Sequence, residues 1–155
     1  MKERLDPHTA SPKAIKAMLK LEDYTHHCGL EHALVELVKI RASQINGCAY
    51  CLDMHTRDAR SAGESEQRLY VLSAWTESPL YSERERAALA WTEALTRIAD
   101  SGVPDAVYNQ AREHFSEEEL VNLSLLVGGI NIWNRLAVAF HRQHPMEPAG
   151  LGAVG

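Results

Sequence analysis

The sequence predicts an all-α protein of about six or seven helices, arranged as one domain over residues 1–155. Apolar residues recur at helical spacing along most of the chain, which is typical of amphipathic helices. Two capping boxes, Ser82 with Glu85 and Ser116 with Glu119, mark helix starts. No run of branched and aromatic residues alternates with polar ones, as it would in a half-buried strand. A chain of this length can bury a core of its own.

Most of the expected helices have a local start or stop signal. Ser11-Pro12 is typical of an N-cap followed by proline at the first helical position. Asn46-Gly47 is a turn signal between the second and third helices, and Gly63 ends the third. Pro145 ends the last and longest helix, beyond which residues 148–155 are expected to fray. The helices are expected from 12 towards 29, from about 31 to 43, from 48 to about 62, from 65, from 82 to about 100, from 104, and from 117 to about 142.

Composition excludes several classes of protein. The net charge of −5, without a cluster of lysine or arginine, argues against nucleic acid as a partner. The N-terminal residues lack the apolar core of a signal peptide, and asparagine, serine and arginine interrupt the most apolar stretch, 120–140, so we expect no membrane span. Of the three cysteines, two are only three positions apart, unlike the framework of a disulfide-stapled secreted domain. We therefore expect a cytoplasmic protein with a redox-active or metal-binding cysteine pair.

Residues 43–55 carry the strongest chemical signal, a C-x-x-C pair followed by a histidine. In a helix that begins near Cys48, the residues Cys48, Cys51 and His55 lie within about 60° of one another on one face. The first turn of a helix offers unpaired N–H groups and a partial positive charge, which stabilise a thiolate. The pattern therefore predicts a redox dithiol with a proton acceptor beside it. The helix dipole alone favours Cys48, nearer the helix start, as the more acidic thiol.

Other candidate residues are less specific. Glu36 lies 12 positions before Cys48, on the preceding helix of a predicted hairpin. It could reach His55 or Cys51, or it could be a solvated surface carboxylate, and the spacing leaves both open. His26 and the adjacent His27 are expected to interact with the negative end of the first helix, with metal ligation or catalysis as the alternative.

The segment 43–55 resembles the core of the AhpD-like alkylhydroperoxidases, within the carboxymuconolactone decarboxylase family. Weaker similarity extends over residues 63–69, 115–119 and 131–137, so that the resemblance covers a core of about 21–140. It implies an all-helical fold and a homo-oligomer, commonly a trimer or a hexamer. An apolar last helix that carries Trp133 and two adjacent glycines also favours a homo-oligomer, because close helix approach would justify glycine there.

The resemblance also implies roles for particular residues. Cys51 matches the cysteine that attacks the peroxide, Cys48 the resolving cysteine, His55 the base of a proton relay, and Glu36 the glutamate of that relay. Such members carry a second histidine where this chain has Tyr50, which removes one titratable group from the relay. The implied substrate is a hydroperoxide and the implied reductant is a dithiol or a thioredoxin-like protein. No cofactor and no metal ion are expected.

Three other functions are compatible with the same residues. Lactone decarboxylation, the other activity in the family, would not need two cysteines so placed. A zinc site made by Cys48, Cys51 and His55 would lack an evident fourth ligand. A redox-sensing module without enzymatic activity would use the disulfide to change its assembly. Elemental analysis and turnover of a hydroperoxide with a dithiol would separate these possibilities.

Overall fold

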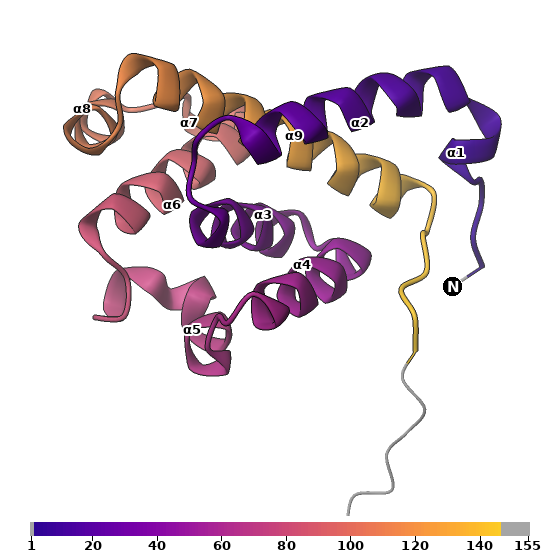
Figure 1. Cartoon of the computed structure of the whole chain (residues 1–155), viewed down its shortest axis with the longest axis horizontal. Helices are drawn as coiled ribbons and strands as arrows, with labels where there is room; N and C mark the ends of the chain where they lie inside the picture. Colours follow the sequence, from indigo (N-terminus) through magenta and orange to yellow (C-terminus); the bar gives the residue numbers. More distant parts are fainter. Residues whose placement is uncertain (1, 147–155) are drawn as a thin grey trace, which may run out of the picture.

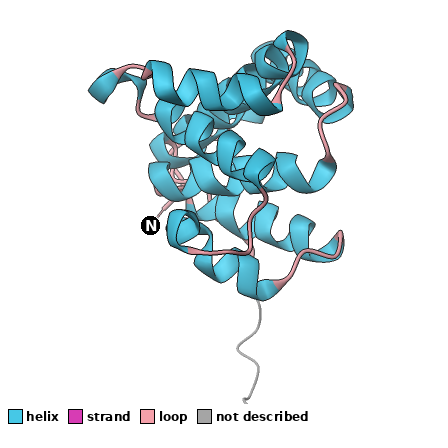
Figure 2. Cartoon of the chain, turned by 90° about the vertical axis from the view of Figure 1, so that its left-hand side faces the viewer, coloured by secondary structure: helices cyan, strands magenta, loops and turns pink. Residues whose placement is uncertain are grey.

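The structure is a computed structural model that describes residues 2–146, and every regular element within that range is a helix (Figures 1 and 2). The prediction of an all-α fold is therefore confirmed. The helices outnumber the expected six or seven because α1 was not expected and two expected helices are each divided. In chain order they are α1 (Pro7–Ala10), α2 (Pro12–His27), α3 (His32–Asn46), α4 (Ala49–Ser61), α5 (Glu66–Val71), the 3-10 helix η1 (Leu72–Glu77), α6 (Glu83–Thr96), α7 (Ile98–Ser101), α8 (Asp105–His114) and α9 (Glu117–Ala139).

Helix α3 is the centre of the molecule, and α4, α6 and α9 pack around it (Figure 1). Every residue from 34 to 43 is buried, because this part of α3 meets another element on each side. One apolar cluster joins α3 to α6, α8 and α9, and a second joins it to α4, α5, η1 and α6. The core therefore fixes α3 tightly, and any side chain that α3 directs into a cavity has a well-defined position.

The turn between α3 and α4 forms the predicted helical hairpin. Gly47 adopts a left-handed conformation with φ of 64°, which glycine tolerates without strain. The backbone N–H of Cys48 then donates to the carbonyl oxygen of Ser43 at 3.0 Å. Cys48 is the N-cap of α4, so it lies one position before the helix rather than inside the first turn. Both predicted capping boxes, at Ser82 and Ser116, are also present.

The two ends of the described chain meet beside α9. The backbone N–H of Arg4 donates to the carbonyl oxygen of Phe140 at 2.9 Å, and Arg142 lies 3.5 Å from the carboxylate of Asp6. Helix α1 consequently lies next to the C-terminal end of α9 (Figure 1). Helix α9 ends at Ala139, three residues earlier than predicted, and residues 148–155 lie outside the described range.

The glycine pair of α9 does not mark close helix packing within this chain. A methyl group at Gly128 would meet nothing within 4 Å, and one at Gly129 would meet only Leu21 at 3.8 Å, an ordinary contact distance. Among residues 2–146 no helix of the same chain makes a tight approach, and the other expectation, a helix of another subunit, stays a prediction.

No helix among residues 2–146 combines the length and the apolar character that a membrane span requires.

Candidate active site

The two cysteines of the C-x-x-C motif form a disulfide at the start of α4. The backbone N–H of Cys51 also donates to the Cys48 sulfur at 3.3 Å, so this sulfur caps the helix. Both residues are buried, with 1% and 2% of their surface exposed. The third cysteine, Cys28, is a half-buried free thiol in a different apolar cluster. The dithiol is therefore a local pair that Cys28 does not join.

A buried hydrogen bond links Glu36 on α3 to His55 on α4. The Oε2 atom of Glu36 lies 2.9 Å from Nδ1 of His55, and the two residues are only 3% and 5% exposed. Glu36 is thus not a surface carboxylate. Burial raises the pKa of the Glu36 carboxyl, but the hydrogen bond from His55 and the nearby Lys39 ammonium outweigh this effect, so its pKa lies below the usual value.

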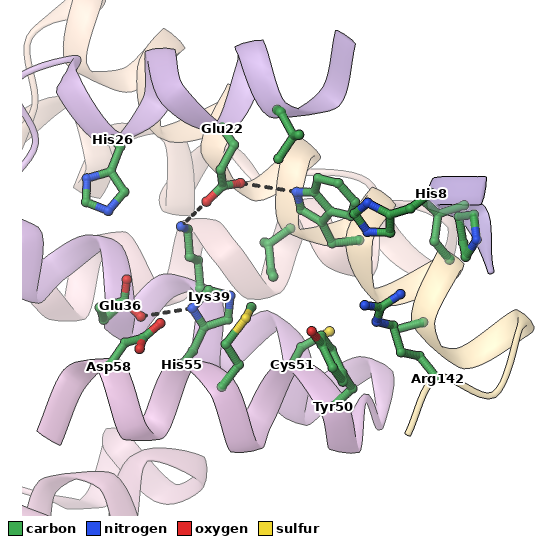
Figure 3. Close-up of a pocket in the computed structure, with 17 residues that line it drawn as sticks. His8, Glu22, His26, Glu36, Lys39, Tyr50, Cys51, His55, Asp58 and Arg142 are labelled. Carbon is green, nitrogen blue, oxygen red and sulfur yellow. Dashed lines mark hydrogen bonds and ion pairs between the residues drawn. The ribbon is translucent and has the colours of Figure 1, made fainter. Parts of the chain in front are cut away.

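The ionised carboxylate decides which nitrogen of His55 carries the proton. A carboxylate only accepts hydrogen bonds, so Nδ1 must be the protonated nitrogen that donates to Glu36. In the neutral imidazole the other nitrogen, Nε2, is then a free acceptor. The pair therefore holds a base within one helical turn of Cys51 (Figure 3).

An apolar cavity of about 330 Å³ brings these residues together (Figure 3). Cys51, His55 and Glu36 line it from α3 and α4, whereas α2 and α9 contribute apolar side chains such as Leu19 and Trp133. Cys48 does not line this cavity. It lines a second one of about 290 Å³, between the start of α4 and the chain beyond α9. The two sulfurs of one disulfide thus border two different cavities.

An ion pair that the sequence did not predict forms part of the cavity wall. Lys39, which is 2% exposed, pairs with Glu22 of α2, and the Trp133 indole N–H donates to the same carboxylate at 3.2 Å (Figure 3). A lysine three residues after Glu36, in a mainly apolar part of α3, could have indicated a buried ion pair. Its charge is neutralised inside the cavity because α2 covers this face of α3.

Tyr50, the residue between the two cysteines, lies at the other end of the cavity (Figure 3). The guanidinium of Arg142 lies 5.0 Å from the centre of its ring, which is within the range of a cation–π contact. Tyr50 and Arg142 also line the second cavity. They therefore lie between the cavity that Cys51 lines and the cavity that Cys48 lines.

A buried polar network fixes the motif against α9. The side-chain N–H of Asn46 donates to Asn131 at 3.0 Å and to Asn134 at 2.8 Å, and Asn134 in turn donates to the hydroxyl of Ser43 at 3.0 Å. Ser43 and Asn134 are fully buried. These bonds join the C-terminal end of α3, directly before the α3–α4 turn, to one face of α9. They explain why the sequence carries polar residues within its most apolar helix.

The described residues also include two groups of side chains whose ligand atoms lie within 4.8 Å of one another, His26 with His32 and Glu36, and Glu36 with His55 and Asp58. Neither group contains a cysteine. The zinc site that the sequence allowed, with Cys48 and Cys51 as ligands, is not formed in this structure because the two sulfurs are bonded to each other.

Comparison with known proteins places these features in a family context. The model of the carboxymuconolactone decarboxylase family matches residues 11–94, more than half of the chain. The uncharacterised protein YdfG of Bacillus subtilis is 46% identical over 139 residues, which cover 90% of this chain and 95% of YdfG.

Solved structures agree with this match. ATU0492 of Agrobacterium tumefaciens, a protein of unknown function provisionally described as the antioxidant defence protein AhpD, superposes with a TM-score of 0.92 at 50% identity, over 94% of this chain and all of that one. An uncharacterised peroxidase-related protein of Ralstonia eutropha JMP134, described as an alkylhydroperoxidase AhpD core, shares the fold with a TM-score of 0.78 at 19% identity, over 89% of this chain and 74% of that one.

Proposed function

Because the chain belongs to the AhpD-like part of the carboxymuconolactone decarboxylase family, we propose that it is a thiol-dependent peroxidase that reduces hydroperoxides through its Cys48–Cys51 pair. One observation carries the proposal. Cys51 and the buried His55–Glu36 pair line the same apolar cavity, so a thiol, a base and room for an organic substrate coincide. The first reaction is the reduction of the peroxide by Cys51.

In that step His55 takes the proton of the Cys51 thiol on Nε2, and Glu36 stabilises the resulting imidazolium. The thiolate attacks the terminal oxygen of the hydroperoxide. A sulfur–oxygen bond forms while the oxygen–oxygen bond breaks, so that sulfur is oxidised to a sulfenic acid and the peroxide is reduced. The leaving alkoxide takes the proton from His55 and departs as an alcohol.

In the second step Cys48 resolves the sulfenic acid. Its thiolate attacks the sulfur of Cys51, the sulfur–sulfur bond forms, and hydroxide leaves with a proton as water. The product is the disulfide that this structure contains. A dithiol or thioredoxin-like reductant then restores both thiols by exchange, and attack on Cys48 from the second cavity would leave the substrate cavity free.

The two cavities favour Cys51 over Cys48 as the attacking residue. A helix dipole would make the sulfur nearer the helix start more acidic, yet Cys48 lies outside the cavity that His55 and Cys51 line. Proton removal by a positioned base contributes about 10²-fold or more to a rate, which exceeds the effect expected from a small pKa difference. The chemistry therefore assigns attack to Cys51 and resolution to Cys48.

A steady-state assay tests the proposal. The reduced protein should consume an alkyl hydroperoxide continuously when a dithiol is supplied, and the Cys51→Ser variant should not. The Cys28→Ser variant is the matched control and should keep full activity, because Cys28 lies outside the site. Stoichiometric oxidation of the pair without turnover would instead indicate a redox-sensing module, and turnover that survives in Cys51→Ser would contradict the assigned role.

A further inference from the structure

Two histidines outside the proposed reaction converge with Glu36 at the end of the cavity opposite Tyr50. His26 lies in the last turn of α2, His32 is the first residue of α3, and Glu36 follows one turn later on the same face. Their ligand atoms all lie within 4.8 Å of one another, and the rings of His26 and His32 are 5.2 Å apart. Figure 3 shows His26 and Glu36 facing each other across this end of the cavity. The arrangement joins two helices at the loop that connects them.

We propose that His26, His32 and Glu36 form a binding site for a divalent transition-metal cation such as Zn²⁺. Two imidazoles and one carboxylate are a ligand set that zinc and its neighbours bind, with water completing the coordination. The charge is also suitable, because Glu36 is ionised and the Lys39 ammonium near it is neutralised by its ion pair with Glu22.

The geometry needs only a small closure to bind the cation. Ligand atoms around a tetrahedral zinc ion with bonds of about 2.1 Å lie roughly 3.4 Å apart. Two of the three ligands, His26 and His32, are exposed on the surface, so rotation of their side chains can supply the difference. Glu36 is buried and fixed by its bond to His55, so it provides the rigid part of the site.

The site shares Glu36 with the catalytic relay. The effect of zinc on catalysis rests on the proposed peroxidase function, whereas zinc binding itself does not. A cation on Glu36 competes with His55 for the negative charge that stabilises its imidazolium. Zinc should therefore slow peroxide reduction by binding at the end of the cavity that His26 lines, without becoming a ligand of the cysteines.

Titration calorimetry with ZnCl₂ tests the site. The disulfide form is used, because bonded sulfurs cannot act as thiolate ligands. We expect one site in the wild-type protein and, since even outer-shell partners change metal affinity by about ten- to hundredfold, a loss of at least about tenfold in His26→Gln and in His32→Gln. His27→Gln is the matched control, an exposed histidine on the same helix, and should bind as the wild type does.

The outcomes separate this inference from the proposed function. Unchanged zinc affinity in both His26→Gln and His32→Gln overturns the site, and loss of binding in Asp58→Asn alone would assign the cation to the other group, Glu36, His55 and Asp58. Zinc binding without peroxidase turnover supports the metal site and contradicts the proposed function. Turnover without zinc binding supports the proposed function and contradicts the metal site. Circular dichroism of each variant verifies that the fold is kept.

Discussion

The Nδ1 atom of His55 lies 2.9 Å from Oε2 of Glu36, and both side chains are buried against the cavity that Cys51 lines. This contact fixes the orientation of the imidazole and leaves its second nitrogen as an acceptor. It also couples two packed helices that a tight turn connects. The proposed proton relay depends on this one hydrogen bond.

The Glu36→Gln variant keeps the shape of the relay and removes its charge. We expect the alkylation of Cys51 to require a higher pH than in the wild type, because the imidazolium loses its carboxylate partner. Peroxide turnover should fall by up to about 10²-fold, the lower range for a positioned base. His55→Ala should have a similar effect. The double variant should lose less activity than the two single losses combined predict, since the two residues act as a unit. An unchanged alkylation profile in Glu36→Gln would remove Glu36 from the relay.

The lowered pKa of Glu36 predicts a specific loss of stability in acid. The folded value lies below the reference of 4.5, so the unfolded state binds the proton more readily as the pH falls. The contribution of Glu36 to stability is therefore present above about pH 4.5 and is lost as the pH falls through the folded pKa.

Urea unfolding of the disulfide form at pH 7 and at pH 3 measures this contribution. The wild type should lose more unfolding free energy between the two conditions than Glu36→Gln does. The exposed Glu113 offers a control, because Glu113→Gln should lose as much as the wild type. Equal losses in the wild type and Glu36→Gln would contradict the lowered pKa.

The amide network at the α3–α4 turn should contribute to stability as well as to the position of the motif. Asn134→Ala removes one hydrogen bond from Asn46 and one to Ser43, and each such bond contributes about 0.5–1.5 kcal/mol to stability. Urea unfolding should show this decrease, while Asn109→Ala on the surface of α8 should change stability by less than about 0.5 kcal/mol. A neutral Asn134→Ala would show that the network does not hold the turn.

The outer face of α9 predicts self-association. Val121, Leu125 and Ile132 are each at least 41% exposed, and Gly128 lies between them on the same helix. We expect a homo-oligomer, a trimer or a hexamer, by light scattering at micromolar concentration. Leu125→Glu should weaken the assembly, because it places a charge in the apolar face, whereas Leu19→Glu, at an exposed position on α2, should not. A monomeric wild-type protein would refute this prediction.

Helical periodicity and capping signals predicted the parts of the fold that depend on local sequence. Cys48, Cys51 and His55 share one face because the period of a single helix determines it. The change from α5 to the 3-10 helix η1 and the kink at Ala74 inside η1 escaped prediction, since no glycine or proline lies within four residues of Ala74. Local signals therefore located the helices better than their interruptions.

The contacts between helices were harder to predict. Spacing left Glu36 undecided because its distance from His55 depends on how α3 and α4 cross. Lys39 and Glu22 pair only because α2 folds over α3, and nothing in either sequence segment specifies that angle. His26 was assigned to its own helix end, yet its neighbours in the structure include His32 from the next helix.

Trapping of a sulfenic acid tests the central claim, that Cys51 attacks the peroxide, most directly. The Cys48→Ser variant, reduced and treated with one equivalent of an alkyl hydroperoxide, should accumulate the sulfenic acid because no resolving thiol is left. Dimedone should then label Cys51, as located by tandem mass spectrometry, while Cys51→Ser treated in the same way should leave Cys48 unlabelled. Labelling of Cys48 in Cys51→Ser, with none on Cys51 in Cys48→Ser, would contradict the account.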